Sequence, residues 1–299
     1  MRGFARTDKG GNASFRTLNA VAALAADRTR RRSAIKTSID YQQIRGAPPL
    51  QQDALLVGGR VHQEDELSGQ EAADRSFIVG IADGVSSTPK AERMSRRLLG
   101  EVERAYRQGD GAFNARLIRR AQWEVSGDTG KGRLRRESAC TVVLAKVEDG
   151  RVTVLNTGDS RAYVIDGVTG ALRRLSKDHT AFQMLKDSGA LPPEAQDCDY
   201  GSVVTGLMEA VTATPMGDED FKVHMDYTAL GETQIVLLCS DGVTAHLRDE
   251  EIAAEVVAAR AAGEDACARL VERVRERGAS DNTTVIVITP EERGSPEKE

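Results

Sequence analysis

Acidic residues recur in this sequence at the points where apolar runs of strand length begin or end. Because carboxylates at neighbouring strand ends repel one another at pH 7, such a cluster requires a cation among them. Two of these acids end an apolar run and are followed by glycine, in Ile81-Ala-Asp-Gly84 and Cys239-Ser-Asp-Gly242. The pattern therefore predicts a cation site built from Glu64, Asp65, Asp83, Asp159, Asp241 and Asp281.

The ligand chemistry of this cluster indicates a hard ion. Carboxylate oxygens without accompanying cysteine or histidine favour Mg²⁺ or Mn²⁺ over zinc. Two such ions bridged by a carboxylate can deprotonate a water molecule and stabilise the charge on a transferring phosphoryl group. The residue types alone therefore point to hydrolysis of a phosphate ester.

Asp-Gly pairs usually form turns, and the sequence contains its own comparison. The pairs at 149–150 and 166–167 lie between two strand-like runs, as hairpin turns do. The pairs at 83–84 and 241–242 instead follow an apolar strand and lead into Ser or Thr and a helical stretch. We therefore interpret only the latter two as site residues.

Two basic residues precede Glu64 at strand spacing. The period of two places Arg60, His62 and Glu64 on one face of a strand. The guanidinium of Arg60 can hold a phosphate through two hydrogen bonds. His62 titrates near neutrality and is a candidate for protonating the leaving group, although a surface histidine without such a role is the alternative.

The apolar runs predict an alternation of strands and helices between residues 53 and 290. Four strands at 140–147, 151–157, 161–165 and 171–175 read as a meander, and 189–216 reads as an irregular flap. We expect further strands at 76–82, 234–240 and 283–289, and helices at 89–106, 112–125, 180–187, 249–262 and 264–277.

Composition limits the class of protein. The chain has 299 residues, 29% of them charged, and a net charge of −5, which does not suggest nucleic acid or membrane as a partner. The four cysteines lack CxxC spacing and no secretory signal is recognised, so we expect a cytoplasmic protein. We expect a flexible N-terminal extension over 1–50, one domain over 51–290 and a disordered tail over 291–299.

The motifs, taken in order, resemble those of the bacterial-type, metal-dependent type 2C serine/threonine phosphatases. The resemblance covers roughly residues 55–289. The segments that carry it are Arg60-Val-His-Gln-Glu-Asp65, Ile81-Ala-Asp-Gly84, Cys140-Thr-Val-Val143, Thr157-Gly-Asp-Ser-Arg161, Lys177-Asp-His-Thr180, Cys239-Ser-Asp-Gly242 and Ser280-Asp-Asn-Thr283. It implies an α+β fold, a four-layer α/β/β/α sandwich of two antiparallel sheets flanked by helices.

The resemblance also implies a role for each matching residue. Asp83 is expected to bridge two metal ions. Asp241 and Asp281 are expected to complete the ligands of the first ion, and Glu64 and the Gly84 carbonyl are expected to bind the second. Asp65 is expected to be a ligand or to fix metal waters, Asp159 to help hold a third ion with Asp241, and Arg60 to bind phosphate. Some family members have histidine where this chain has Val85, and that histidine is thought to protonate the leaving group.

These features together predict a metal-dependent protein-serine/threonine phosphatase acting in signalling. Its expected partners are phosphoserine and phosphothreonine proteins and a cognate kinase or that kinase's substrates. Two alternatives are a pseudophosphatase that binds phosphoproteins as a regulator, and a hydrolase of small phosphoesters. Retention of the acids and of Arg60 argues against the pseudophosphatase, because a binding protein needs none of them.

Overall fold

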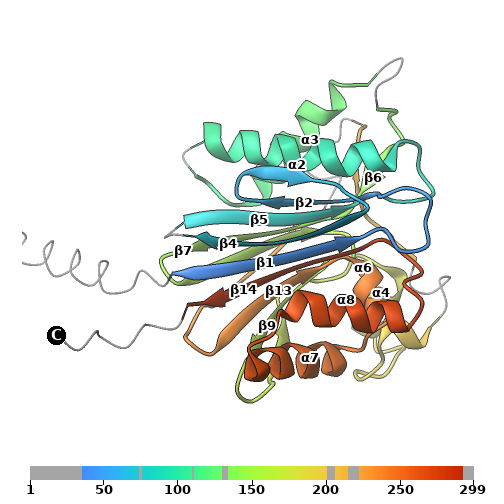
Figure 1. The fold of residues 1–299 in the computed structure, drawn as a ribbon. Coiled ribbons are helices and arrows are strands. Elements are labelled where there is room, and N and C mark those ends of the chain that lie inside the picture. The colour runs from blue at the N-terminus through green and yellow to red at the C-terminus, as the bar shows by residue number, and fades with distance from the viewer. Residues whose placement is uncertain are drawn as a thin grey trace, which may run out of the picture.

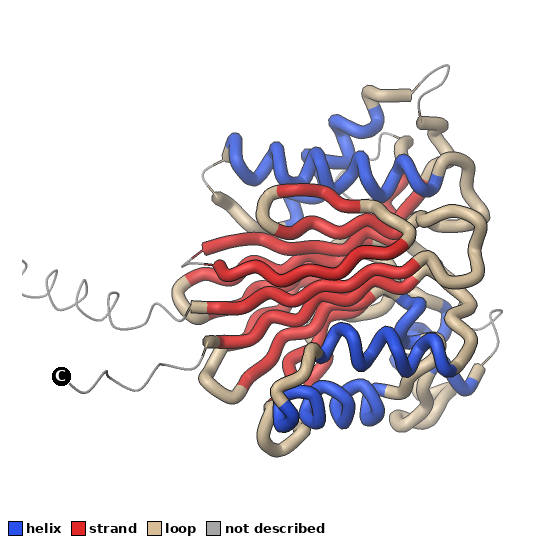
Figure 2. The backbone as a smooth tube through the Cα atoms, in the orientation of Figure 1, coloured by secondary structure: helices blue, strands red, loops and turns tan. Residues whose placement is uncertain are grey.

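The fold consists of two antiparallel β-sheets packed face to face, with helices on both outer faces (Figure 1). The computed structural model of the protein describes residues 36–73, 76–109, 111–129, 134–200, 206–214 and 222–291. Within these ranges the layers follow one another as helices, sheet, sheet, helices (Figure 2). The four-layer α/β/β/α sandwich expected from the sequence is confirmed.

Each of the two large sheets has six strands, and a two-stranded pairing lies beside them. The first sheet has the order β10 (Leu172–Arg174), β9 (Arg161–Asp166), β13 (Gln234–Cys239), β14 (Thr283–Pro290), β1 (Thr37–Ile44) and β4 (Glu66–Ala73). The second has the order β12 (His224–Ala229), β8 (Arg151–Thr157), β7 (Val142–Glu148), β5 (Ser76–Asp83), β2 (Asp53–Val57) and β3 (Arg60–His62). The small pairing joins β11 (Val211–Thr212) to β6 (Ala139–Cys140).

The helices divide between the two outer faces (Figure 1). Those that cover the second sheet are α2 (Ala91–Gln108) and α3 (Ala115–Ser126), and those that cover the first are α7 (Asp249–Ala262) and α8 (Ala266–Glu276). Shorter helices are α4 (Ala181–Asp187), α6 (Asp241–Thr244) and the 3₁₀ turn η1 (Asp197–Asp199).

Three apolar layers hold the sandwich together, and β2 shows how they form. All five residues of β2 are buried. Leu55 and Val57 face the other sheet, whereas Ala54 and Leu56 face α2. A strand covered on both faces needs apolar residues at every position, which explains why its sequence does not alternate.

The flexible extension predicted for residues 1–50 is wrong from Thr37 onward. Residues Thr37–Ile44 form β1, which lies between β14 and β4 and pairs with both. Ile39 and Tyr41 are buried in the inter-sheet core. The polar residues between these buried positions made the strand hard to recognise in the sequence. Residues 1–35 and 292–299 lie outside the described ranges, so the predictions for the N-terminal segment before β1 and for the tail after Glu291 remain predictions.

The meander predicted for residues 140–175 is also wrong, because its strands belong to two different sheets. β7 and β8 form a hairpin in the second sheet, whereas β9 and β10 form a hairpin in the first. The chain crosses between the sheets at Gly158, which has φ +103°. A Cβ there would lie 2.6 Å from the Cβ of Thr141, so only glycine fits. Asp159 follows directly and therefore stands at the crossing.

Candidate metal centre

Four of the predicted acids line one cavity of about 700 Å³ at the ends of the central strands. They are Asp83, Asp159, Asp241 and Asp281, and the predicted ligand Gly84 lines the same cavity. Residues 206–210, which belong to the segment predicted to be a flap, form part of its wall. Acids separated by up to about 200 positions in the sequence thus share one cavity.

Both large sheets contribute to this cavity. Asp83 is the last residue of β5 in the second sheet. Asp241 follows β13 and begins α6, and Asp281 precedes β14, both at the same end of the first sheet. Because β13 and β14 are antiparallel neighbours, the end of one and the start of the other meet.

The glycines after Asp83 and Asp241 are required by close contacts rather than by turns. A Cβ on Gly242 would lie 2.0 Å from the carbonyl oxygen of Asn282. A Cβ on Gly84 would lie 2.6 Å from the carbonyl oxygen of Ala91, in the first turn of α2. By contrast, Gly150 has φ +74° in the β7–β8 hairpin. As the sequence predicted, the Asp-Gly pair at 149–150 forms a hairpin turn, whereas the pairs at 83–84 and 241–242 do not.

Asp53 is an acid of this region that the sequence interpretation missed. It begins β2 and lies directly opposite Asp83 in the β2–β5 pairing. Its side chain is fully buried, and its Oδ2 accepts a hydrogen bond from Thr284 Oγ1 at 2.7 Å. Its Oδ1 is buried without a hydrogen-bond partner among the described residues. A buried carboxylate oxygen without a donor is what a cation site leaves behind when only protein atoms are considered.

Burial and mutual repulsion make these acids reluctant to ionise. Burial raises the pKa of Asp53 to about 7, against the favourable hydrogen bonds from Thr284 and Ser240. Burial first, then the charges of Asp53 and Asp241, raise the pKa of Asp83 well above its usual range. The pKa of Asp159 is raised for the same kind of reason, by burial and by Asp241. A divalent cation would relieve both costs, so the donor set fits Mg²⁺ or Mn²⁺.

The acids stand near one another without forming a finished coordination shell. Within the described ranges, no three histidine, cysteine, aspartate or glutamate side chains already form a group with the geometry of a metal site.

The backbone of Asp53 is held by a polar network that a single change would disturb. Its N–H donates to Gln51 Oε1 at 3.0 Å, and its carbonyl accepts from Gln43 Nε2 at 3.2 Å. Gln43 also donates to Thr284 Oγ1 at 3.0 Å, the hydroxyl that binds the Asp53 carboxylate. The available signal in the sequence was the same one used for the other acids, since Gln52-Asp53 directly precedes the apolar run 54–57.

Glu64 and Asp65 lie near Asp53 but do not line the cavity. Glu64 is exposed, and its backbone N–H donates to Gln43 Oε1 at 2.8 Å. Asp65 has a side chain that is 64% exposed and forms an ion pair with Arg45 at 2.7 Å. The structure thus does not bring the carboxylates of these two residues together with Asp83.

Arg60 and His62 do not line the cavity that the acids share. Arg60 is paired with Val57, at the opposite end of β2 from Asp53. Four residues of strand separate these ends, about 13 Å at 3.3 Å per residue. His62 packs against the ring of Tyr41, with 6.1 Å between the ring centroids. Neither residue lines the cavity.

Arg45 is the basic residue that the structure places beside the Asp281 segment. Its carbonyl accepts from Asn282 Nδ2 at 2.6 Å, and Asn282 Oδ1 accepts from the N–H of Gln52 at 2.7 Å. Asn282, the residue after Asp281, therefore joins the residue that follows β1 to the residue before Asp53. Sequence reasoning overlooked Arg45 because it precedes the match to the family motif.

The Asp-His pair at 178–179, within the matching segment 177–180, makes structural contacts. Asp178 forms a buried ion pair with Arg161. The Nδ1 of His179 accepts from the N–H of Gly158 at 3.0 Å, next to Asp159. The carbonyl of His179 accepts from the N–H of Met208 at 2.8 Å, in the cavity wall. His179 therefore connects Gly158, the residue before Asp159, to the cavity wall at residues 206–210.

Comparisons of the sequence with known proteins identify the family. The family model "Protein phosphatase 2C" matches residues 58–279. The serine/threonine phosphatase stp of Listeria welshimeri is 26% identical over 247 residues, covering 77% of this chain and 90% of that protein. PstP of Mycobacterium tuberculosis is 27% identical over 241 residues, covering 79% of this chain and 41% of that protein.

Solved structures show the same fold. The crystal structure of M. tuberculosis PstP/Ppp matches with a TM-score of 0.65 at 21% identity, covering 86% of this chain and all of that one. A structure of the PstP catalytic domain in complex with two manganese ions matches with a TM-score of 0.62 at 21% identity, covering 85% and 98%. The matched family segment makes up most of the chain, and the chain belongs to the protein phosphatase 2C family.

Proposed function

We propose that Asp53, Asp83, Asp241 and Asp281, with the Gly84 carbonyl, hold the divalent ions of a metal-dependent serine/threonine phosphoprotein phosphatase. The observation that carries this assignment is the unpartnered, fully buried oxygen of Asp53 opposite Asp83, in a cluster of acids whose pKa values are raised. Asp159 lines the same cavity and is assigned to a further ion shared with Asp241.

The bound Mg²⁺ or Mn²⁺ supplies Lewis-acid chemistry, lowering the pKa of a water molecule and neutralising charge on the phosphoryl group. The chain's own residues fix the position of that chemistry. Thr284 and the Gln43 and Gln51 side chains orient Asp53. The close contact at Gly242 holds Asp241 against the Asp281 segment. The ligands are thus placed by backbone packing before any ion binds.

Arg45 is our candidate for the phosphate-binding cation, in place of Arg60. Its backbone carbonyl binds Asn282, and its side chain, which is 41% exposed, carries a fixed charge paired with Asp65. Its partner Asp65 is largely exposed, so the pair is weak and can open when a phosphate arrives. Arg60, at the far end of β2, has no such access.

The substrates are phosphoproteins, and we extend the proposal to the products of a cognate kinase in the cytoplasm. No helix within the described ranges is long and apolar enough to cross a membrane. The alternatives are a binding protein without turnover and a hydrolase of small phosphoesters. The raised pKa values favour an enzyme, because a site that only binds phosphoproteins gains nothing from crowded acids.

A panel of substrates tests the proposal. With Mn²⁺ present, we expect turnover of phosphoserine and phosphothreonine peptides and of nitrophenyl phosphate. Absence of turnover on every one of them would support the binding protein. Turnover confined to small phosphoesters would support a hydrolase of small phosphoesters instead of a protein phosphatase.

A further inference from the structure

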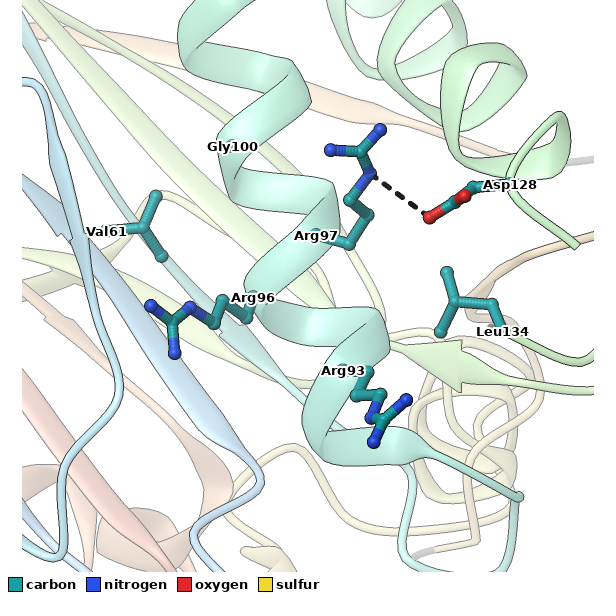
Figure 3. Close-up of a pocket in the computed structure, with 7 residues that line it drawn as sticks. All are labelled: Val61, Arg93, Arg96, Arg97, Gly100, Asp128 and Leu134. Atoms are coloured by element: carbon teal, nitrogen blue, oxygen red, sulfur yellow. Dashed lines mark ion pairs between the residues drawn. The ribbon is translucent and has the colours of Figure 1, made fainter. Parts of the chain in front are cut away.

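A second cavity, outside the metal centre, lies over the exposed face of α2 (Figure 3). Its volume is about 450 Å³. Three arginines of one helix line it together with two apolar residues, a glycine and one acid. The lining residues are Arg93, Arg96, Arg97, Val61, Leu134, Gly100 and Asp128.

The three arginines that line this cavity, hereafter the groove, point to different sides of α2. Figure 3 shows Arg97 leaning toward Asp128 on one side of α2 and Arg96 directed toward Val61 on the other, with Arg93 nearer the start of the helix. Arg97 is already paired with Glu101 at 2.9 Å and with Asp128 at 3.7 Å. Arg93 forms an exposed ion pair with Glu92 at 3.7 Å, which is weak enough for an anion to displace, and Arg96 is exposed, so both residues can meet an anion.

The surrounding helical layer is basic although the whole chain is acidic. Helices α2 and α3 together carry eight arginines and four glutamates. The chain has a net charge of −5. Such segregation of charge favours association with an acidic partner at this face.

Gly100 adds an independent reason to expect a ligand. It lies inside an 18-residue helix, where glycine is about 1 kcal/mol less favourable than alanine. A Cβ at Gly100 would meet no atom within 4 Å, unlike those at Gly84 and Gly242. The fold therefore does not require glycine here, and the missing side chain leaves room for a chain lying close against the helix.

The groove begins close to the metal centre. Helix α2 starts at Ala91, whose carbonyl lies against Gly84 in the metal-centre cavity, and Arg93 follows two residues later. From Arg93 to Gly100 the helix rises about 10 Å, the length of about three residues of extended peptide.

We propose that this groove docks an acidic segment of the phosphoprotein substrate, a few residues away from the phosphorylated side chain. The inference rests on the proposed phosphatase activity and names a substrate class for it. Arg93 and Arg96 bind carboxylates of the segment, Val61 and Leu134 contact its apolar atoms, and Gly100 leaves room for its backbone. These are docking residues, separate from the residues that hold the ions.

The test compares phosphothreonine peptides that carry four glutamates with peptides that carry four glutamines, placed on either side of the phosphothreonine. We expect one glutamate peptide to have a KM roughly ten-fold below that of its glutamine counterpart, the upper end of what two exposed ion pairs supply. The double variant Arg93→Gln/Arg96→Gln should lose this advantage, with kcat little changed. The matched control Arg116→Gln/Arg120→Gln removes the same charge from exposed positions of α3 and should keep the advantage.

A third variant keeps the test decisive if the double variant fails to fold. Gly100→Glu places a carboxylate among the arginines at a position with open space, and should also abolish the advantage. Nitrophenyl phosphate, which has no peptide, should be turned over equally by all variants. An equal KM for glutamate and glutamine peptides in the parent, or an advantage that persists in both groove variants, overturns the docking proposal. Failure of the parent on nitrophenyl phosphate would instead refute the phosphatase assignment.

Discussion

Asp53 and Asp83 lie directly opposite each other on the neighbouring antiparallel strands β2 and β5. The charge of Asp53 is a leading cause, after burial, of the raised pKa of Asp83. Two carboxylates held this way by backbone pairing cannot move apart without breaking the sheet. Their repulsion is therefore a fixed feature of the fold that a cation can relieve.

The first prediction separates Asp53 from Glu64. Asp53→Asn should weaken Mn²⁺ binding and lower turnover, by about 10- to 100-fold if it acts like a residue that orients or binds a metal. Glu64→Gln should have a small effect, because the Glu64 side chain is exposed outside the cavity. Calorimetric titration with Mn²⁺ and phosphopeptide kinetics measure both. The reverse order of effects would restore the ligand assignment made from the sequence.

That Asp83, Asp241 and Asp281 lie together could be predicted from the sequence, because each acid adjoins a strand long enough to recognise. Asp53 was missed because β2 has only five residues, and because Glu64-Asp65 offered a closer match to the family motif. β1 was missed because the residues between its buried positions, such as Asp40 and Gln42, are polar. Which acids face each other depends on strand register between distant segments, which local patterns do not reveal.

The second prediction concerns the stability of the metal-free protein. The pKa of Asp53 is raised from 3.8 to about 7, so the folded state holds a proton that the unfolded state has lost between these values. Stability should therefore fall as pH rises from about 4 to 7, by linkage. The melting temperature at pH 5 should exceed that at pH 8 by several degrees, since about 1 kcal/mol shifts Tm by about 2–4 °C in a domain of this size.

Asp53→Asn is the control for that measurement, because histidines also titrate in this range. Burial lowers the pKa of His179 and of His246, which acts in the opposite direction. The difference between parent and variant isolates Asp53. Parallel curves of Tm against pH for the two proteins would show that Asp53 ionises normally.

The third prediction compares the two candidate phosphate-binding arginines. Arg45→Gln should raise KM for a phosphopeptide several-fold, because it removes a fixed charge from a residue whose backbone binds Asn282, next to Asp281. Arg60→Gln, with the same change of charge at the far end of β2, should leave KM almost unchanged. Steady-state kinetics at saturating Mn²⁺ decide between them. A larger rise in KM for Arg60→Gln than for Arg45→Gln would contradict the assignment of phosphate binding to Arg45.

The fourth prediction concerns the N-terminal boundary. Deleting residues 1–35 leaves β1 whole and should preserve activity on nitrophenyl phosphate. Deleting residues 1–48 removes β1, which pairs with β14 on one side and β4 on the other, and should prevent folding. Circular dichroism and soluble yield measure the outcome. A folded, active product of the longer deletion would show that β1 is dispensable.

The central claim is that the acids of the cavity hold the ions on which hydrolysis depends. Its most direct test is the rate of phosphothreonine-peptide hydrolysis by metal-stripped protein as Mn²⁺ is added, in the parent and in Asp83→Asn. We expect no turnover without metal, saturable turnover in the parent and little turnover in the variant at any Mn²⁺ concentration. Full turnover by verified metal-free protein, or a Mn²⁺ response of Asp83→Asn equal to that of the parent, would contradict the account.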